Sequence, residues 1–121
     1  MNPEIKPFNP ENEYFFHEGC HIMELSNQDG DSDLSIARAR VSPGVTTTWH
    51  RLEGTIERYV ILEGQGLVEL ENINPRKVFP GDAVIIPANC PQRITNTGTT
   101  DLIFLALCTP RFKPENYRTL E

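Results

Sequence analysis

A histidine and a glutamate stand within a stretch of the chain that begins and ends with glycine. Five residues separate Gly44 from His50, and six separate His50 from Glu57. Six more residues lead to Gly64. An imidazole and a carboxylate that meet in a small cavity are good ligands for a divalent metal, and they can also exchange protons with a substrate. The spacing therefore predicts a metal centre or a proton-transfer site that contains His50 and Glu57.

The residues around this pair are typical of β-strands, in which every second side chain points to the same face. Alternation puts Thr48 on the face of His50, and it puts Tyr59 on the face of Glu57. If both faces point into one barrel, His50 and Glu57 converge across a hairpin. We therefore predict that Thr48 and Tyr59 line a substrate pocket. The alternative for Tyr59 is an aromatic side chain that only fills the barrel.

Most of the chain is predicted to form short strands between turns that contain glycine or proline. The run 45–50 is mostly β-branched or aromatic and is expected to be a strand, whereas the asparagine, aspartate and glycine of 27–33 indicate a turn. Many short strands with little room for a helix indicate a single all-β domain with a closed sheet or sandwich. We expect this barrel over residues 13–110, an extended N-terminal arm over 1–12, and a C-terminal tail over 111–121.

Two arginines lie on one face of the expected strand 34–41. Arg38 and Arg40 alternate with small, mostly apolar residues. One interpretation places the small residues in the core and both guanidinium groups outside. The other places the arginines inside the barrel, where they would bind a carboxylate or a phosphate. Because burial of an unpaired arginine is very costly, the first interpretation is favoured.

The composition restricts the partners and the cell compartment. The 121 residues carry a net charge of −6 with a pI near 5.0, which disfavours binding to nucleic acid. No apolar run reaches the length of a membrane span, and the N-terminus lacks the apolar core of a signal peptide. The three cysteines show no CxxC spacing, so a disulfide framework is not expected. These features favour a cytoplasmic protein that binds neither nucleic acid nor membrane.

The glycine-bounded stretch resembles the first sequence motif of the cupin family, a group of small β-barrels that usually hold one metal ion. Its residues Gly44, His50, Glu57 and Gly64 match the motif at the right spacing. The family's second histidine is replaced by Leu52. The resemblance implies an all-β, single-domain jelly-roll barrel, also called a double-stranded β-helix.

A second stretch resembles the second cupin motif, so that the resemblance covers roughly residues 34–108. Gly81, Pro87 and Asn96 match this motif, whereas Asn89 replaces its glycine and Gln92 replaces its histidine. The resemblance implies a metal ion held by three histidines and one glutamate. Leu52 and Gln92 stand in place of two of those histidines.

The resemblance implies that His50, Glu57 and Gln92 are the remaining ligands of a divalent Fe, Mn, Ni or Zn ion. Water or substrate would fill the open positions; alternatively, a fourth ligand would come from elsewhere, with His17, His21 or Cys108 as candidates. An amide oxygen is a weaker donor than imidazole for such metals, so the affinity is expected to be low. Alternatively the metal has been lost, and His50 and Glu57 form a polar pair that acts as acid and base.

Three classes of function follow for this chain. The resemblance implies a metal-dependent dioxygenase, isomerase or lyase acting on small organic acids or sugars. The second class is a metal-free isomerase or cyclase that uses His50 and Glu57, and the third is a module that binds a small ligand without turnover. The resemblance also implies a homodimer, for which Trp49 on the outer surface and the arm at 1–12 are candidate contacts.

Overall fold

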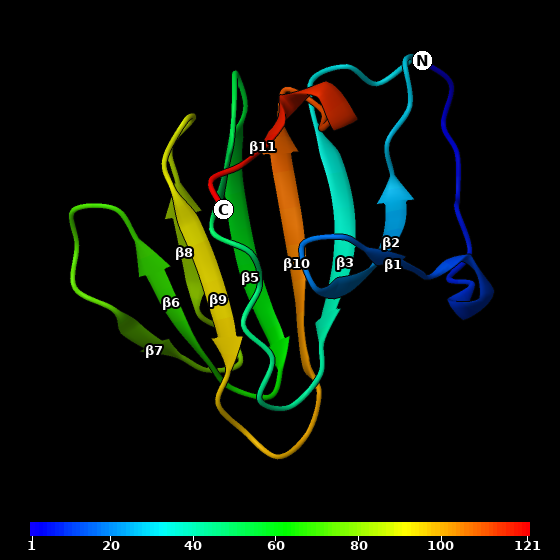
Figure 1. Cartoon of the computed structure of the whole chain (residues 1–121). Coiled ribbons are helices and arrows are strands. Elements are labelled where there is room, and N and C mark those ends of the chain that lie inside the picture. The colour runs from blue at the N-terminus through cyan, green and yellow to red at the C-terminus, as the bar shows by residue number, and fades with distance from the viewer.

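The computed structural model describes residues 1–121 as two antiparallel sheets that face each other (Figure 1). One sheet has the strand order β1-β2-β3-β10-β5-β8, and the other has the order β11-β4-β9-β6-β7. The strands are β1 Tyr14–Phe16, β2 Cys20–Ser26, β3 Ser35–Val41, β4 His50–Leu52, β5 Ile56–Glu63, β6 Gly66–Leu70, β7 Arg76–Val78, β8 Ala83–Ile86, β9 Gln92–Asn96, β10 Leu102–Thr109 and β11 Tyr117–Thr119. This is the all-β jelly roll that the sequence predicts.

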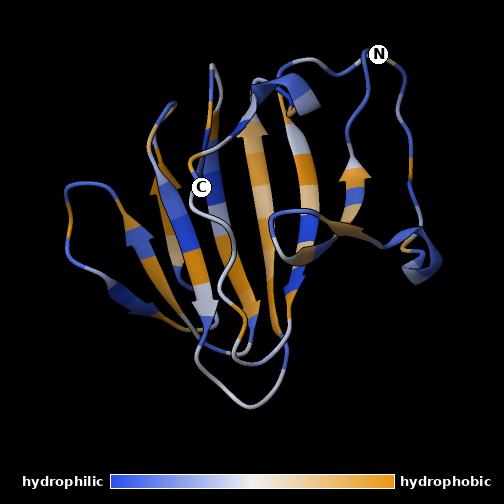
Figure 2. Ribbon diagram, in the orientation of Figure 1, coloured by the Kyte–Doolittle hydropathy of each residue, from blue (hydrophilic) through white to orange (hydrophobic).

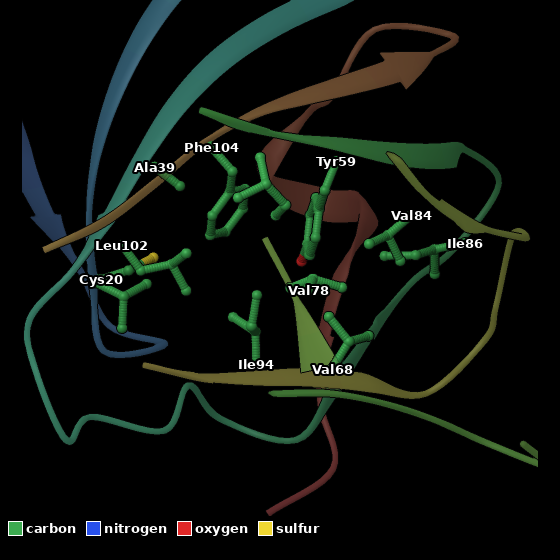
Figure 3. Close-up of a cluster of buried hydrophobic side chains, with 12 residues drawn as sticks. Cys20, Ala39, Tyr59, Val68, Val78, Val84, Ile86, Ile94, Leu102 and Phe104 are labelled. Carbon is green, nitrogen blue, oxygen red and sulfur yellow. The ribbon is translucent and has the colours of Figure 1, made fainter. Parts of the chain in front are cut away.

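The hydrophobic core lies between the two sheets and follows the alternation of the strands. Ile61 of β5, Leu102 of β10 and Ile94 of β9 are at most 1 % exposed, and Figure 3 shows such side chains from both sheets pointing toward one another. Burial of one aliphatic side chain contributes roughly 1.5–3 kcal/mol. Figure 2 shows β10 as the most continuously hydrophobic strand, consistent with its place in the middle of the larger sheet.

The small residues of β3 face the interior, and its arginines lie outside. Ala39 is 2 % exposed, whereas Arg38 and Arg40 both contact Glu13 at the end of the N-terminal arm. Arg38 also lies over the ring of Phe8, 5.5 Å from its centroid. The favoured interpretation of this strand is therefore confirmed, and the two arginines fasten the arm to the outer face of the sheet.

Two turn residues explain how the motif spacing is preserved. Gly64 has a φ of 80°, and a Cβ there would lie 2.6 Å from the carbonyl oxygen of Asp101, so only glycine fits this hairpin. Asn89, which stands where the cupin motif has glycine, has a φ of 67°. Asparagine tolerates this left-handed conformation better than most residues, so it can occupy a turn position for which glycine is usual.

The prediction of a continuous strand over 45–50 is wrong. Only an isolated bridge joins Thr46 to Thr95, and β4 begins at His50. The physical reason is Thr47, whose hydroxyl accepts a hydrogen bond from the Ile94 amide at 3.0 Å and contacts the Ile94 carbonyl at 3.3 Å. A threonine hydroxyl that bonds the backbone competes with regular strand pairing.

Both ends of the chain contribute to the sheets. After the short 3-10 helix Pro10–Asn12, β1 forms a hairpin with β2. After a second short helix, Pro114–Asn116, β11 pairs with β4 and places Tyr117 opposite Leu52. A strand thus lies within the predicted tail at 111–121. Neither helical segment has the length and apolar character that crossing a membrane requires.

Candidate functional site

A largely apolar cavity lies against the inner face of the larger sheet. Its wall is formed by β3, β10 and β5, and it is covered by the β1–β2 hairpin, β4 and β11. The volume is about 60 Å³, which corresponds to roughly four water molecules. Several polar side chains reach this cavity, namely Glu18, Glu24, Ser35, His50, Glu57, Tyr59 and Tyr117. The cavity is therefore a place where a small molecule would meet ionisable groups in apolar surroundings.

Glu57 is held by a hydrogen-bonded chain that crosses the core. The amide nitrogen of Gln92 donates to Glu57 Oε1 at 2.8 Å, and the hydroxyl of Tyr59 donates to the amide oxygen of Gln92 at 2.5 Å. Glu57 and Tyr59 belong to β5 of the larger sheet, whereas Gln92 belongs to β9 of the smaller one. All three side chains are buried, so the chain fixes the carboxyl group in one orientation.

The surroundings of Glu57 favour its neutral form. Burial is the largest cause, and the nearby Glu18 carboxylate adds to it, whereas the hydrogen bond from Gln92 acts in the opposite direction. The pKa of Glu57 rises from 4.5 to about 8. The thiol of Cys108, 4.0 Å from Glu57 Oε2, also has a raised pKa because it is buried. Glu57 is thus placed to act as a carboxylic acid at neutral pH.

His50 lies between a backbone carbonyl and a second glutamate. Its Nδ1 is 2.6 Å from the carbonyl oxygen of Thr48, and its Nε2 is 3.1 Å from Oε2 of Glu18. A carbonyl oxygen only accepts hydrogen bonds, so Nδ1 carries a proton. Hydrogen bonding between Nε2 and the Glu18 carboxyl group then requires a second proton that the two groups share. We refer to these two residues as the His50–Glu18 pair.

Glu18 is a site residue that the sequence analysis missed. It lies in the turn between β1 and β2, where its carbonyl oxygen accepts a hydrogen bond from the Thr48 amide at 2.7 Å. Its Oε1 accepts a hydrogen bond from the Cys20 thiol at 3.0 Å. The turn is far from both motifs in the sequence, and no spacing connects it to His50. The turn is brought beside His50 by the tertiary fold, in which the Thr48 amide bonds the Glu18 carbonyl oxygen.

Tyr117 is a second residue that the sequence analysis missed. Its ring stacks on His50, with centroids 4.9 Å apart and planes inclined by 22°, and it lines the cavity. Its hydroxyl oxygen is buried and has no hydrogen-bond partner in the protein. The residue lies in the segment that the sequence assigns to a tail, and only its aromatic character marks it as a pocket residue.

The two predicted pocket residues have different places. Tyr59 lines the cavity and packs on Phe104, with ring centroids 4.3 Å apart. Thr48 is not among the lining residues, because the irregular backbone before β4 interrupts the alternation on which its prediction rests. Its backbone carbonyl nevertheless orients His50. Leu52, which replaces a cupin histidine, is buried and also lines the cavity.

The three predicted metal ligands come together, but their donor atoms are already engaged. The Gln92 oxygen accepts from Tyr59, while its nitrogen faces Glu57. The Nε2 of His50 faces Glu18. No group of three or more histidine, cysteine, aspartate or glutamate side chains is arranged to hold a metal ion. This donor set does not fit a cupin metal centre, and metal binding stays a prediction.

The candidate additional ligands do not complete such a centre. His17 is exposed and packs against Phe16 and Tyr117. His21 packs against Phe15 on the side of the β1–β2 hairpin that does not line the cavity, with ring centroids 5.2 Å apart. Neither histidine lines the cavity, whereas the third candidate, Cys108, does.

Comparison with known proteins agrees with this architecture. The Cupin domain family model matches residues 37–108. An uncharacterized protein of Methanocaldococcus jannaschii is 37 % identical over 120 residues, which cover 98 % of this chain and 90 % of that protein. The oxalate-binding protein of Thermotoga maritima is 37 % identical over 90 residues, or 74 % of this chain and 73 % of that protein. The structure of KdgF from Halomonas sp. has a TM-score of 0.75 at 23 % identity, over 87 % of this chain and 94 % of that one, and shows the likeness of fold.

Proposed function

The chain belongs to the cupin family, and we propose that it binds a small organic molecule in the barrel cavity and moves a proton on it without a resident metal ion. The observation that carries this proposal is that two proton-holding groups from different elements reach the same apolar cavity. Glu57 comes from β5, and the His50–Glu18 pair comes from β4 and the β1–β2 turn. Two such groups with different environments are suited to acid and base roles.

The reaction class that fits this arrangement is isomerisation through an enol. With the shared proton on His50, the Glu18 carboxylate of the pair takes a proton from the carbon next to a carbonyl group, while Glu57 donates its proton to the carbonyl oxygen. When the carbon that loses its proton bears a hydroxyl group, the product is an enediol. The pair then returns its proton to the former carbonyl carbon while the other hydroxyl gives its proton to Glu57, so the carbonyl group moves to the neighbouring carbon and no oxidant or reductant is required. The apolar walls favour this chemistry because they exclude water from the developing charge.

The name of one relative supplies a second candidate ligand, namely oxalate. The cavity gives little support to it. Glu18, Glu24 and Glu57 line the cavity, and no lysine or arginine does. A dianion would need a metal ion or a guanidinium group to balance its charge, so we favour a substrate of lower charge.

Hydrogen–deuterium exchange tests the proposal directly. The protein, stripped with a chelator, is incubated in D₂O with hydroxyacetone and pyruvamide, and loss of the proton signals next to the carbonyl group is followed by NMR. We expect exchange above the buffer rate that falls by roughly 10²-fold or more in Glu57→Gln and in His50→Gln. Glu71→Gln, which changes an exposed carboxylate of the loop after β6, is the matched control.

Three outcomes would contradict the proposal. Exchange at the buffer rate for both probes would remove the catalytic assignment, and binding without exchange would favour the non-catalytic module instead. Exchange that the stripped protein lacks and that appears when Fe, Mn, Ni or Zn is added would favour the metal-dependent class of cupins over the metal-free one.

We further propose that the protein is a homodimer that packs through the part of the larger sheet's outer face formed by β5 and β8, away from the N-terminal arm at β3. Ile56 and Leu62 of β5 and Ile85 of β8 project from this face and are 37 %, 44 % and 58 % exposed. In a two-fold dimer the same patch of each subunit meets its copy, so these apolar side chains would be covered by one another. We expect a dimer in sedimentation velocity that dissociates in Ile85→Lys. A monomeric wild type would contradict this.

The three cysteines support a reducing compartment. Cys20 and Cys108 are buried, and neither they nor Cys90 forms a disulfide. Free buried thiols are typical of cytosolic proteins, and we propose a cytoplasmic location. Fractionation of native cells with an antibody tests it, and recovery in the extracellular fraction would overturn it.

A further inference from the structure

The hydroxyl of Tyr117 is a buried polar group that the protein itself does not satisfy. Its oxygen has essentially no contact with solvent and no hydrogen-bond partner. Leaving such a group unpaired costs about 1–3 kcal/mol, so in most proteins a partner of some kind is present. Because the residue lines the cavity, a ligand is the natural partner.

The ring of Tyr117 is fixed by its neighbours, so its hydroxyl is presented in one direction. It stacks on His50, and its edges meet Phe16 and His17, with centroids 5.2 Å and 4.9 Å away and planes inclined by 89° and 88°. All of these contacts involve the ring and none uses the oxygen. Burial and the nearby Glu18 carboxylate raise the pKa of Tyr117, so the hydroxyl keeps its proton and remains a donor.

The charge of the cavity restricts the ligand that would accept this hydrogen bond. The lining contains three glutamates, Glu18, Glu24 and Glu57, and no lysine or arginine. The one basic side chain in the lining, His50, already faces the Glu18 carboxyl group. A carboxylate ligand would therefore meet acidic groups without a free cation, whereas a carbonyl group would meet a donor and no net repulsion.

We propose that Tyr117 donates a hydrogen bond to the carbonyl oxygen of the ligand, and that the site selects small uncharged carbonyl compounds. This inference rests on the proposed function and specifies its substrate class. Tyr117 and Glu57 would then both donate hydrogen bonds to the carbonyl oxygen of the substrate. The His50–Glu18 pair would face the carbon next to the carbonyl group. The cavity of about 60 Å³ limits the substrate to a few non-hydrogen atoms.

The test compares two probes that have nearly the same shape and different charge, pyruvamide and pyruvate. Binding is followed by ligand-observed NMR, and the ketone carbon is labelled with ¹³C so that its chemical shift reports hydrogen bonding. We expect pyruvamide to bind at least tenfold more tightly than pyruvate and its ketone resonance to move downfield when bound. Tyr117→Phe should weaken pyruvamide binding about tenfold and abolish that shift.

Glu71→Gln is the control, because Glu71 is exposed in the loop after β6 and does not line the cavity. It should leave both the affinity and the shift unchanged, and circular dichroism should show both variants folded. Tighter binding of pyruvate, no detectable binding of pyruvamide, or an unchanged shift in Tyr117→Phe would each overturn the inference. If Tyr117→Phe behaves as expected but no probe exchanges its protons, the carbonyl site stands and the proposed catalysis fails.

Discussion

Gln92 donates a hydrogen bond to Glu57 at 2.8 Å and so joins the two sheets through their side chains. The motif that this stretch resembles has a histidine where this chain has Gln92, and here the amide bonds two side chains of the core. Its nitrogen faces Glu57 and its oxygen accepts from Tyr59, so neither end is free for a metal. The glutamine converts a ligand position into a polar link within the core.

The metal content of the protein follows from these engaged donors. We expect the wild type, purified without a His-tag, to hold far less than one Fe, Mn, Ni or Zn ion per chain in inductively coupled plasma mass spectrometry. The double variant Leu52→His/Gln92→His restores the ligand types of the family and should gain near-stoichiometric metal. Near-stoichiometric metal in the wild type that is lost in His50→Ala would instead establish a metal site.

The raised pKa of Glu57 makes stability depend on pH. The folded protein holds this proton up to about pH 8, whereas the unfolded chain releases it near pH 4.5. The folded state therefore binds more protons between these values, and the free energy of unfolding falls as the pH rises through this range, by up to a few kcal/mol. Chemical denaturation at a series of pH values measures this decline.

Glu57→Gln should remove most of that decline, because an amide does not titrate and is nearly the same size. Glu71→Gln, at an exposed position, should retain it. A wild-type stability that is constant between pH 5 and pH 8, or one that rises, would show that Glu57 is ionised in the folded protein.

Gly64 provides a test of the motif's structural role. Its positive φ of 80° and the 2.6 Å approach of the Asp101 carbonyl leave no room for a side chain. We expect Gly64→Ala to lower the free energy of unfolding by at least about 2 kcal/mol. Gly30→Ala is the control, because a Cβ at Gly30 would meet nothing within 4 Å, and it should change stability by less than about 0.5 kcal/mol. Equal effects at both positions would contradict this explanation.

The sequence predicted the fold because the information for it is local and periodic. Alternation along the strands separates Ala39 from Arg38 and Arg40, and glycines such as Gly64 mark turns that need a left-handed backbone. The same reasoning failed at Thr48, because Thr47 bonds the neighbouring strand through its side chain and interrupts the alternation. A period of two has predictive value only where pairing is regular.

The site was only half predictable, for a related reason. His50 and Glu57 lie in a motif with fixed spacing, whereas Glu18 and Tyr117 reach the cavity from opposite ends of the chain. Their positions depend on how β1 and β11 pair with the rest of the sheets, which no short-range pattern encodes. The Gln92 replacement signalled a changed site, but the way its amide is used became evident only from its partners Tyr59 and Glu57.

Coupling between Glu18 and Glu57 gives the sharpest test of the charge balance in the cavity. The Glu18 carboxylate is the second-largest cause of the raised pKa of Glu57, after burial. Glu18→Gln removes that negative charge, so the pKa of Glu57 should fall toward its ordinary value and the decline of stability with pH should become smaller. A ¹³C NMR titration of the Glu57 carboxyl carbon measures the shift.

Glu24→Gln is the matched control for this experiment, because Glu24 lines the same cavity but is not among the causes of the raised pKa of Glu57. It should leave the titration of Glu57 nearly unchanged. If Glu24→Gln shifts that titration as much as Glu18→Gln does, the cavity responds to its total charge and not to one neighbour. If neither variant shifts it, burial alone holds the proton on Glu57, and the His50–Glu18 pair is electrically independent of it.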